Sequence, residues 1–208
     1  MDTPDIFLHT YSSYEEYVAV QTEGNRRKLH NVWARRENLH YLANKLVERG
    51  LDSDSFAVCH GTRNGAEISM LRETGIFKTV IGTEIAETAL QFQNTLHHDF
   101  HTPLPAPIGQ PDVIYSNSLD HAYDPAQAIW AWAGDLKPSG FLVVEHSDRH
   151  EPSGAGPLDP FGLRRDLVSD FVETSSRKLL TFEVELTSLP SRRPDPGYIT
   201  MFVFRACS

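Results

Sequence analysis

Residues 57–67 read AVCHGTRNGAE, in which an apolar run is followed by two glycines and the start of an amphipathic segment. The apolar residues at 55–59 predict a short buried strand, and residues 64–73 can form a helix after it. Gly61 and Gly65 lie between the two, where glycine allows a tight turn and a close approach to a ligand. Open α/β sheets bind ligands at the carboxyl ends of their strands, so this loop is the first candidate site.

Outward from this loop, short apolar runs alternate with helical patterns. Further strands are predicted at 79–82, 95–98, 113–116 and 141–145, and helices at 86–93, 125–133 and 160–173. Two last strands, at 179–187 and 198–205, flank a loop rich in proline and arginine at 188–197. Alternation of this kind predicts a parallel sheet. We expect an α/β fold with a doubly wound, mostly parallel seven-stranded sheet, helices on both faces and a C-terminal antiparallel hairpin.

Residues 1–54 precede the first predicted strand. Apolar residues near helical spacing predict one long helix at 25–49, with Gly50 as its stop signal, and a shorter helix at about 14–20. We expect residues 1–54 to form a helical cap that belongs to the same domain as residues 55–208.

Composition narrows the class of protein. The net charge is −9, from 28 acidic and 19 basic residues, which disfavours broad binding to nucleic acid. The sequence contains no apolar run of the roughly 18 residues that span a bilayer, and its beginning lacks the pattern of a secretory signal. Its two cysteines, Cys59 and Cys207, do not form a disulfide framework. We therefore expect a cytoplasmic protein that binds neither membrane nor nucleic acid.

Two acidic residues follow the next predicted strands. Glu84 comes 23 positions after Gly61 (84 − 61), where a carboxylate can accept both ribose hydroxyls of an adenosine group. Asp99 follows the third strand, where an acid can accept a hydrogen bond from an adenine amino group. The simpler interpretation is that Gly61 and Gly65 serve a plain turn and that Glu84 caps the following helix.

Two later segments complete an ordered pattern: PDVIYSNSLDHAYDP at 111–125 and LKPSGFLVV at 136–144. With the glycine loop and the two acids, they resemble the ordered motifs of class I S-adenosylmethionine-dependent methyltransferases, over residues 56–146. The resemblance implies S-adenosyl-L-methionine as the cofactor. It also implies that the cofactor-binding residues are His60, Gly61, Thr62, Arg63, Gly65, Glu84, Ile85, Asp99, Phe100, Ser116, Asn117 and Ser118.

The sequence departs from the family pattern at three positions. Cys59 stands where an acidic residue is usual, Arg63 replaces the middle glycine, and Ser139 replaces the second glycine of the later turn. Arg63 could pair with the carboxylate of the methionine moiety. It could equally pair with Glu67 on the next helical turn.

The resemblance further implies in-line transfer of the sulfonium methyl group to a small molecule or sugar. Such transfer needs alignment above all, and a base only if the acceptor carries a proton. Candidate catalytic residues at the strand ends are His121 first, then Asp120 and His146, with Glu145 as a further possibility. Asp120 could instead cap a helix. The tyrosines and Trp33 of the predicted cap could cover the cofactor, as caps in this family often do.

A metal site is not expected. His97, His98, Asp99 and His101 cluster in sequence, but alternate residues of a strand face opposite sides, and no Cys-x-x-Cys or His-Glu-x-x-His pattern is present. Other functions stay open. One is an enzyme that uses S-adenosylmethionine without methyl transfer, by intramolecular displacement that releases methylthioadenosine. Another is a non-catalytic, cofactor-binding partner subunit. A nicotinamide oxidoreductase is disfavoured because Gly-x-Gly-x-x-Gly is missing.

Overall fold

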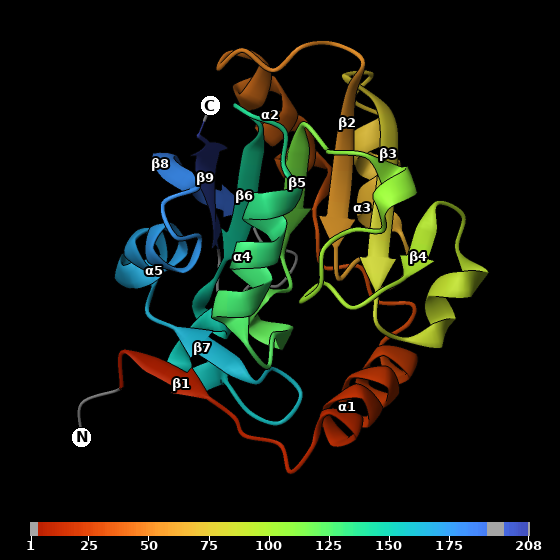
Figure 1. Ribbon diagram of the computed structural model, residues 1–208, viewed down its shortest axis with the longest axis vertical. Helices are drawn as coiled ribbons and strands as arrows, with labels where there is room; N and C mark the ends of the chain where they lie inside the picture. Colours follow the sequence, from red (N-terminus) through yellow and green to blue (C-terminus); the bar gives the residue numbers. More distant parts are fainter. Residues whose placement is uncertain (1–3, 191–197, 208) are drawn as a thin grey trace.

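The computed structural model describes residues 4–190 and 198–207, and its centre is a seven-stranded sheet (Figure 1). The strands are β2 (Ser55–His60), β3 (Phe77–Glu84), β4 (Thr95–His97), β5 (Val113–Ser116), β6 (Phe141–His146), β8 (Leu180–Pro190) and β9 (Tyr198–Ala206). Their spatial order is β4-β3-β2-β5-β6-β9-β8. The strands from β4 to β6 are parallel, whereas β9 is antiparallel to both β6 and β8. The predicted doubly wound sheet with a C-terminal hairpin is confirmed.

Helices cover both faces of the sheet, as predicted. The helices α2 (Arg36–Val47) and α3 (Ala66–Arg72) pack on one face, and α4 (Pro125–Asp135) and α5 (Val168–Ser175) on the other. Successive side chains of a strand point to opposite faces. Cys59 therefore joins the apolar cluster of α2 and α3, while its neighbour Val58 joins that of α4 and α5.

The long helix predicted at 25–49 is wrong. The chain forms α1 (Tyr14–Arg27) and then α2, with a non-helical connection between them. Helix α1 begins at Tyr14, where the shorter helix was predicted, and the Ser13 side chain caps it by accepting a hydrogen bond from the Glu16 backbone N–H. In the connection, the carbonyls of Leu29 and Asn31 accept hydrogen bonds from the Asn64 side-chain amide. These tertiary bonds take the place of helical bonds, and the helical spacing of apolar residues was misleading there.

The predicted helix at 160–173 is wrong in its first half. Residues Phe161–Leu163 form a strand, β7, and α5 begins only at Val168. Strand β7 pairs antiparallel with β1 (Ile6–Leu8), which the sequence pattern did not reveal. Strands of three residues are too short to show a period.

Two smaller differences concern connections. The helix predicted at 86–93 is a short 3₁₀ turn at Glu87–Gln91. Strand β8 extends to Pro190, so the predicted loop at 188–197 starts later, and its residues 191–197 lie outside the described residues.

The strand order reverses at β2, which pairs with β3 on one side and β5 on the other. Such a switch point opens a crevice at the carboxyl ends of the strands. Helix α1 lies across this edge, below the arrowheads of β2 and β3 in Figure 1. Among residues 4–190 and 198–207, no helix has both the length and the apolar character needed to cross a bilayer.

Candidate functional site

The loop after β2 requires glycine at Gly61. Its φ is +71°, in the left-handed region that favours glycine. A Cβ atom placed there would lie 2.5 Å from the Cβ of Ser118, which follows β5. The Ser118 hydroxyl also donates a 3.2 Å hydrogen bond to the Gly61 carbonyl. Gly61 thus allows both the turn and the close contact between the two loops.

Two residues that stand where the family pattern has glycine adopt a backbone conformation that favours glycine. Arg63 has φ +47° and Ser139 has φ +63°, both left-handed. Such a conformation costs a non-glycine residue roughly 1–2 kcal/mol. Both turns therefore have a conformation for which glycine is the least strained residue.

The Arg63 side chain does not pair with Glu67 in the part of the chain that the structure describes. Glu67 instead accepts a 2.8 Å hydrogen bond from the Thr62 hydroxyl, and Nη1 of Arg63 donates to the Asn31 carbonyl at 3.4 Å. The Nε atom of Arg63 is buried and has no hydrogen-bond partner among the described residues. The guanidinium thus has an unused donor at the site.

Glu84 ends β3 with its carboxylate beside the glycine loop. One oxygen accepts a 3.0 Å hydrogen bond from the Arg63 N–H and the other a 3.1 Å bond from the Ala86 N–H. Burial raises the pKa of Glu84, and these backbone bonds oppose the increase. Glu84 therefore does not cap the following 3₁₀ helix, which begins at Glu87 and has no side-chain cap, and each carboxylate oxygen keeps further acceptor capacity.

Asp99 lies just beyond β4 and is bound from two sides. Its carboxylate accepts hydrogen bonds from the Tyr14 hydroxyl at 2.8 Å and from the backbone N–H and Nδ1 of His101 at 3.0 and 2.6 Å. Burial alone would raise the pKa of Asp99, but the bonds from His101 and Tyr14 outweigh burial and lower it. Helix α1 thus contacts the acid predicted to bind adenine.

Two adjoining cavities lie at this edge. The larger, of about 270 Å³, is lined by several predicted residues, namely Gly61, Thr62, Arg63, Asn117, Ser118, Asp120, His121 and Glu145. The smaller, of about 40 Å³, is lined by Glu84, Ile85 and Phe100 and is covered by Tyr17 and Gln21 of α1. Gly61, Arg63, Ser118, His121 and Lys28 border both, so the two cavities adjoin.

Four predicted cofactor residues, His60, Gly65, Asp99 and Ser116, line neither cavity. The His60 ring stacks on Trp132, with centroids 5.0 Å apart, and its Nδ1 bonds the Thr83 hydroxyl. Burial lowers the pKa of His60 to about 3. The Ser116 hydroxyl bonds the His60 carbonyl and therefore supports the loop from within the sheet.

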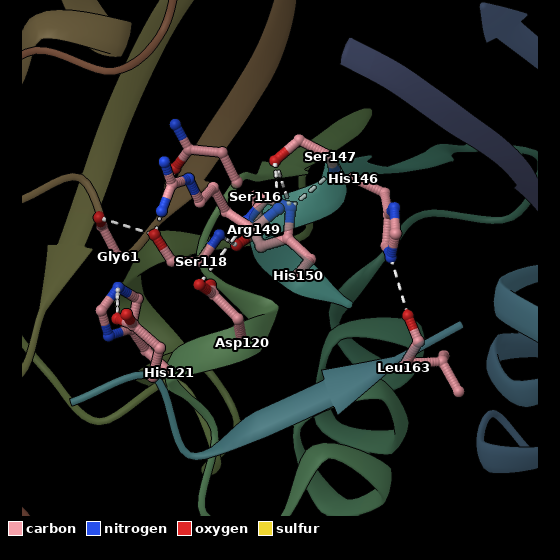
Figure 2. Close-up of polar contacts among 12 residues, drawn as sticks. Gly61, Ser116, Ser118, Asp120, His121, His146, Ser147, Arg149, His150 and Leu163 are labelled. Atoms are coloured by element: carbon pink, nitrogen blue, oxygen red, sulfur yellow. Dashed lines mark hydrogen bonds and ion pairs between the residues drawn. The ribbon is translucent and has the colours of Figure 1, made fainter. Parts of the chain in front are cut away.

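Of the three first catalytic candidates, the structure brings Asp120 and His121 together at the larger cavity. Nδ1 of His121 lies 2.9 Å from the Leu158 carbonyl and 3.0 Å from the Gln21 side-chain oxygen. His146 is buried elsewhere, with its Nε2 bonded to the Leu163 carbonyl at 2.9 Å. Figure 2 shows His146 turned toward Leu163, away from Asp120 and His121. Burial lowers the pKa of His146 to about 4.

Two buried carboxylates also line the larger cavity, Glu67 and Glu145. Glu145 accepts a 2.7 Å hydrogen bond from the Tyr115 hydroxyl, and burial raises its pKa to about 7. Burial also raises the pKa of Glu67. The cavity therefore combines these acids with the cationic side chains of Lys28, Arg63 and Arg149.

Sequence reasoning did not predict that several residues line this cavity, namely Lys28, Glu67, Arg149, His150 and Asp159. For Arg149 and His150 a signal existed, because the polar run SDRH directly follows the buried strand β6. Lys28 and Asp159 are in loops far apart in sequence, and no local pattern marks them.

The histidines at the end of β4 and just after it each bond a different partner. Nε2 of His97 bonds the Ile85 carbonyl, Nε2 of His98 bonds the Thr102 carbonyl, and His101 bonds Asp99. Within the described residues, the group with metal-ligand geometry is a different one: Asp120, His121 and Asp159.

No protein-family model matches the sequence, and no curated protein matches it either. Solved structures do match. The chain is similar to the N-methyltransferase NodS from Bradyrhizobium japonicum WM9, solved with S-adenosyl-L-homocysteine, with 16% identity over 90% of this chain and 99% of that chain and a TM-score of 0.63. It is also similar to the 1,6-didemethyltoxoflavin-N1-methyltransferase of Burkholderia thailandensis, with 12% identity over 96% and 93% of the two chains and a TM-score of 0.66.

A third similar chain belongs to the complex between the Haloferax volcanii Trm112 methyltransferase activator and a methyltransferase. The identity is 15% over 95% of this chain and 100% of that chain, and the TM-score is 0.62. With this agreement in topology, the chain has the class I S-adenosylmethionine-dependent methyltransferase fold. The resemblance in its motifs is thereby confirmed at the level of the fold.

Proposed function

We propose that the protein is an S-adenosylmethionine-dependent methyltransferase that acts on a small molecule. One observation carries the proposal: the Gly61 loop follows β2, Glu84 ends the adjacent parallel strand β3, and both border adjoining cavities at the switch point of the sheet. Two of the similar structures named above were solved with S-adenosylhomocysteine, and one of these also holds 1,6-didemethyltoxoflavin, the small molecule in that enzyme's name. A cytoplasmic location and a cap function for residues 1–54 remain predictions.

The adenosine end of the cofactor would lie in the smaller cavity. Glu84 would accept the ribose hydroxyls, and Asp99 would accept from the adenine amino group beside Ile85 and Phe100. A cavity of about 40 Å³ holds only one or two water molecules. Helix α1 must therefore move away for the cofactor to enter, which breaks the contacts of Tyr14 and Gln21.

The methionine end would lie in the larger cavity, where opposite charges suit a zwitterion. Arg63 has an unused Nε donor for the methionine carboxylate. Glu67 lines the same cavity near Cys59 and contributes to raising the pKa of the Cys59 thiol, after burial. Glu67 would thus supply to the methionine ammonium group the carboxylate that the family usually has at position 59.

The acceptor would face Asp120 and His121. In the transfer, an acceptor atom forms a bond to the methyl carbon while the carbon–sulfur bond breaks, and its electron pair remains on sulfur to give S-adenosylhomocysteine. Both partners of His121 Nδ1 are oxygen acceptors, so Nδ1 carries the hydrogen and Nε2 has a lone pair toward the cavity. His121 would act on the acceptor through that lone pair, by taking its proton or by holding an ion that acidifies it.

A second candidate is an enzyme that keeps the cofactor site without methyl transfer. The chain is similar to the [4+2]-cyclase SpnF, with 16% identity over 81% of this chain and 80% of that chain and a TM-score of 0.57. That similarity favours keeping this alternative.

Incubation with methyl-labelled S-adenosylmethionine tests the proposal. With a panel of small amines, alcohols and thiols, we expect label to appear in an acceptor together with S-adenosylhomocysteine, and the cofactor to stay intact when no acceptor is added. Release of methylthioadenosine without any acceptor would contradict methyl transfer and support intramolecular displacement.

A further inference from the structure

Three metal-ligating side chains converge on the acceptor side of the larger cavity. Asp120 and His121 follow β5, and Asp159 comes from the loop after β6. One potential ligand atom from each lies within 4.8 Å of the other two. Ligands bound at roughly 2.0–2.2 Å are at most about 4.4 Å apart across an ion. The group could therefore close on an ion with shifts of a few tenths of an ångström.

The hydrogen on His121 is placed as it is in metal-binding histidines. Nδ1 lies at hydrogen-bond distance from the Leu158 carbonyl and the Gln21 oxygen, both acceptors, which leaves Nε2 as the ring nitrogen that faces Asp159, at 3.6 Å. A ligating histidine almost always donates its other N–H in this way to a carbonyl or carboxylate. A lone pair and a carboxylate that face each other need a cation or a proton between them.

Asp120 provides a second, independent observation. Its side chain is nine-tenths buried, and its Oδ1 has no hydrogen-bond partner among the described residues. Its other oxygen faces Nε2 of His150 at 3.6 Å. The Ser147 N–H donates to Nδ1 of His150, which fixes the orientation of that ring. An unpaired carboxylate oxygen in a buried position is costly unless a ligand completes it.

We propose that Asp120, His121 and Asp159 bind one divalent metal ion at the acceptor side of the cavity. Two carboxylate oxygens and one imidazole nitrogen suit Mn²⁺, Fe²⁺ or Zn²⁺. Lys28 forms an ion pair with Asp159 at 4.0 Å, and no ion pair with a lysine or arginine is found for Asp120 among the described residues. This inference departs from the sequence-based expectation of no metal, which considered the cluster after β4.

The ion would have open positions toward the cavity, because only three protein ligands converge on it. Its use in the reaction rests on the proposed function. A metal-bound acceptor hydroxyl loses its proton to water more easily, and the resulting oxygen can then form the bond to the methyl carbon. The class of acceptor that fits is therefore a small molecule with a hydroxyl or carboxylate group.

Mn²⁺ binding to the chelator-treated full chain tests the site without cofactor or acceptor. Calorimetry and the loss of the free Mn²⁺ electron paramagnetic resonance signal should show one ion per chain, with a Kd below roughly 100 µM. Asp159→Asn and His121→Gln should each weaken binding by at least about tenfold. Asp148→Asn and His30→Gln are matched controls, because both residues are exposed and outside the group. They should bind Mn²⁺ like the wild type.

Failure to bind Mn²⁺ at concentrations up to about 1 mM would overturn the proposed site, because a Kd of about 1 mM corresponds to a binding free energy of only about 4 kcal/mol. Equal binding by the wild type and the folded Asp159→Asn and His121→Gln variants would overturn it too. Binding of S-adenosylhomocysteine by the same protein sample is a separate readout. Loss of Mn²⁺ binding alone contradicts the metal site, and loss of S-adenosylhomocysteine binding alone contradicts the proposed function.

Discussion

The Tyr14 hydroxyl on α1 donates a 2.8 Å hydrogen bond to the carboxylate of Asp99, 85 positions away at the end of β4. Burial and the adjacent Asp99 raise the pKa of Tyr14, so the hydroxyl keeps its hydrogen. The bond connects the N-terminal helix to the acid predicted to bind adenine. In the proposed binding mode, α1 in its observed position and the cofactor would compete for the same carboxylate.

Tyr14→Phe should tighten the binding of S-adenosylhomocysteine. Removal of a hydrogen bond worth about 0.5–1.5 kcal/mol from the closed state should lower Kd by roughly two- to tenfold. Isothermal titration calorimetry measures the change, and Tyr41→Phe, an exposed residue of α2, is the control. A Kd that rises by a similar factor would mean that Tyr14 contacts the cofactor and does not compete with it.

Arg63→Ala should discriminate between two ligands. S-adenosylhomocysteine carries the methionine carboxylate, so its affinity should fall about 10–100-fold with loss of a charged hydrogen bond. Methylthioadenosine lacks that carboxylate and should bind the variant as it binds the wild type. Arg72→Ala on the exposed side of α3 controls for the loss of charge. Equal losses for both ligands would exclude the carboxylate as the partner of Arg63.

Gly61→Ala should destabilise the fold more than Gly75→Ala. The two glycines have φ values of +71° and +72°, so the conformational cost of alanine is matched at about 1 kcal/mol. A Cβ at Gly61 meets Ser118 at 2.5 Å, whereas nothing lies within 4 Å at Gly75. Urea unfolding measures both, and Ser118→Gly in the Gly61→Ala background should restore part of the loss. Equal effects of the two alanines would contradict the close contact of the loops.

Glu145 should make stability depend on pH. Its folded pKa of about 7 lies above the usual value, so the folded state holds the proton more tightly. The stability from that proton is present below about pH 4.5 and is lost as the pH rises to about 7. Glu145→Gln keeps an acceptor for Tyr115 and removes this loss. Its free energy of unfolding relative to wild type should therefore increase by up to about 3 kcal/mol between about pH 5 and pH 8. A pH-independent difference in urea unfolding would be evidence against a proton on Glu145, and Glu87→Gln is the exposed control.

The sequence predicted best those parts of the fold that form continuous apolar runs. Strand β5 matches the prediction in both bounds, and β2 differs by one residue, because buried parallel strands are continuous apolar runs. Strands β1 and β7 pair residues more than 150 positions apart over only three residues each, and nothing local marks them. The break before α2 depends on bonds from Asn64, which a helical pattern cannot reveal.

The residues of the candidate site also divide into those that sequence motifs predict and those that only tertiary contacts bring in. Motif order was enough to predict Gly61, Asp120 and His121, which line the larger cavity. Asp159 lies 38 positions from His121 (159 − 121) and reaches it only through the loop after β6. Lys28 reaches the same carboxylate from the end of α1. Such tertiary contacts can be identified only from the folded structure.

Titration of the wild type and of Glu84→Ala with S-adenosylhomocysteine tests whether Glu84 binds the ribose of the cofactor. We expect one binding site in the wild type and an affinity at least about 100-fold lower in Glu84→Ala, because two charge-assisted hydrogen bonds to the ribose would contribute about 1.5–3 kcal/mol each. Circular dichroism should confirm that the variant is folded, and Glu87→Ala should bind like the wild type. Absence of binding to the wild type, or an affinity of folded Glu84→Ala within a factor of about two of wild type, would contradict the account.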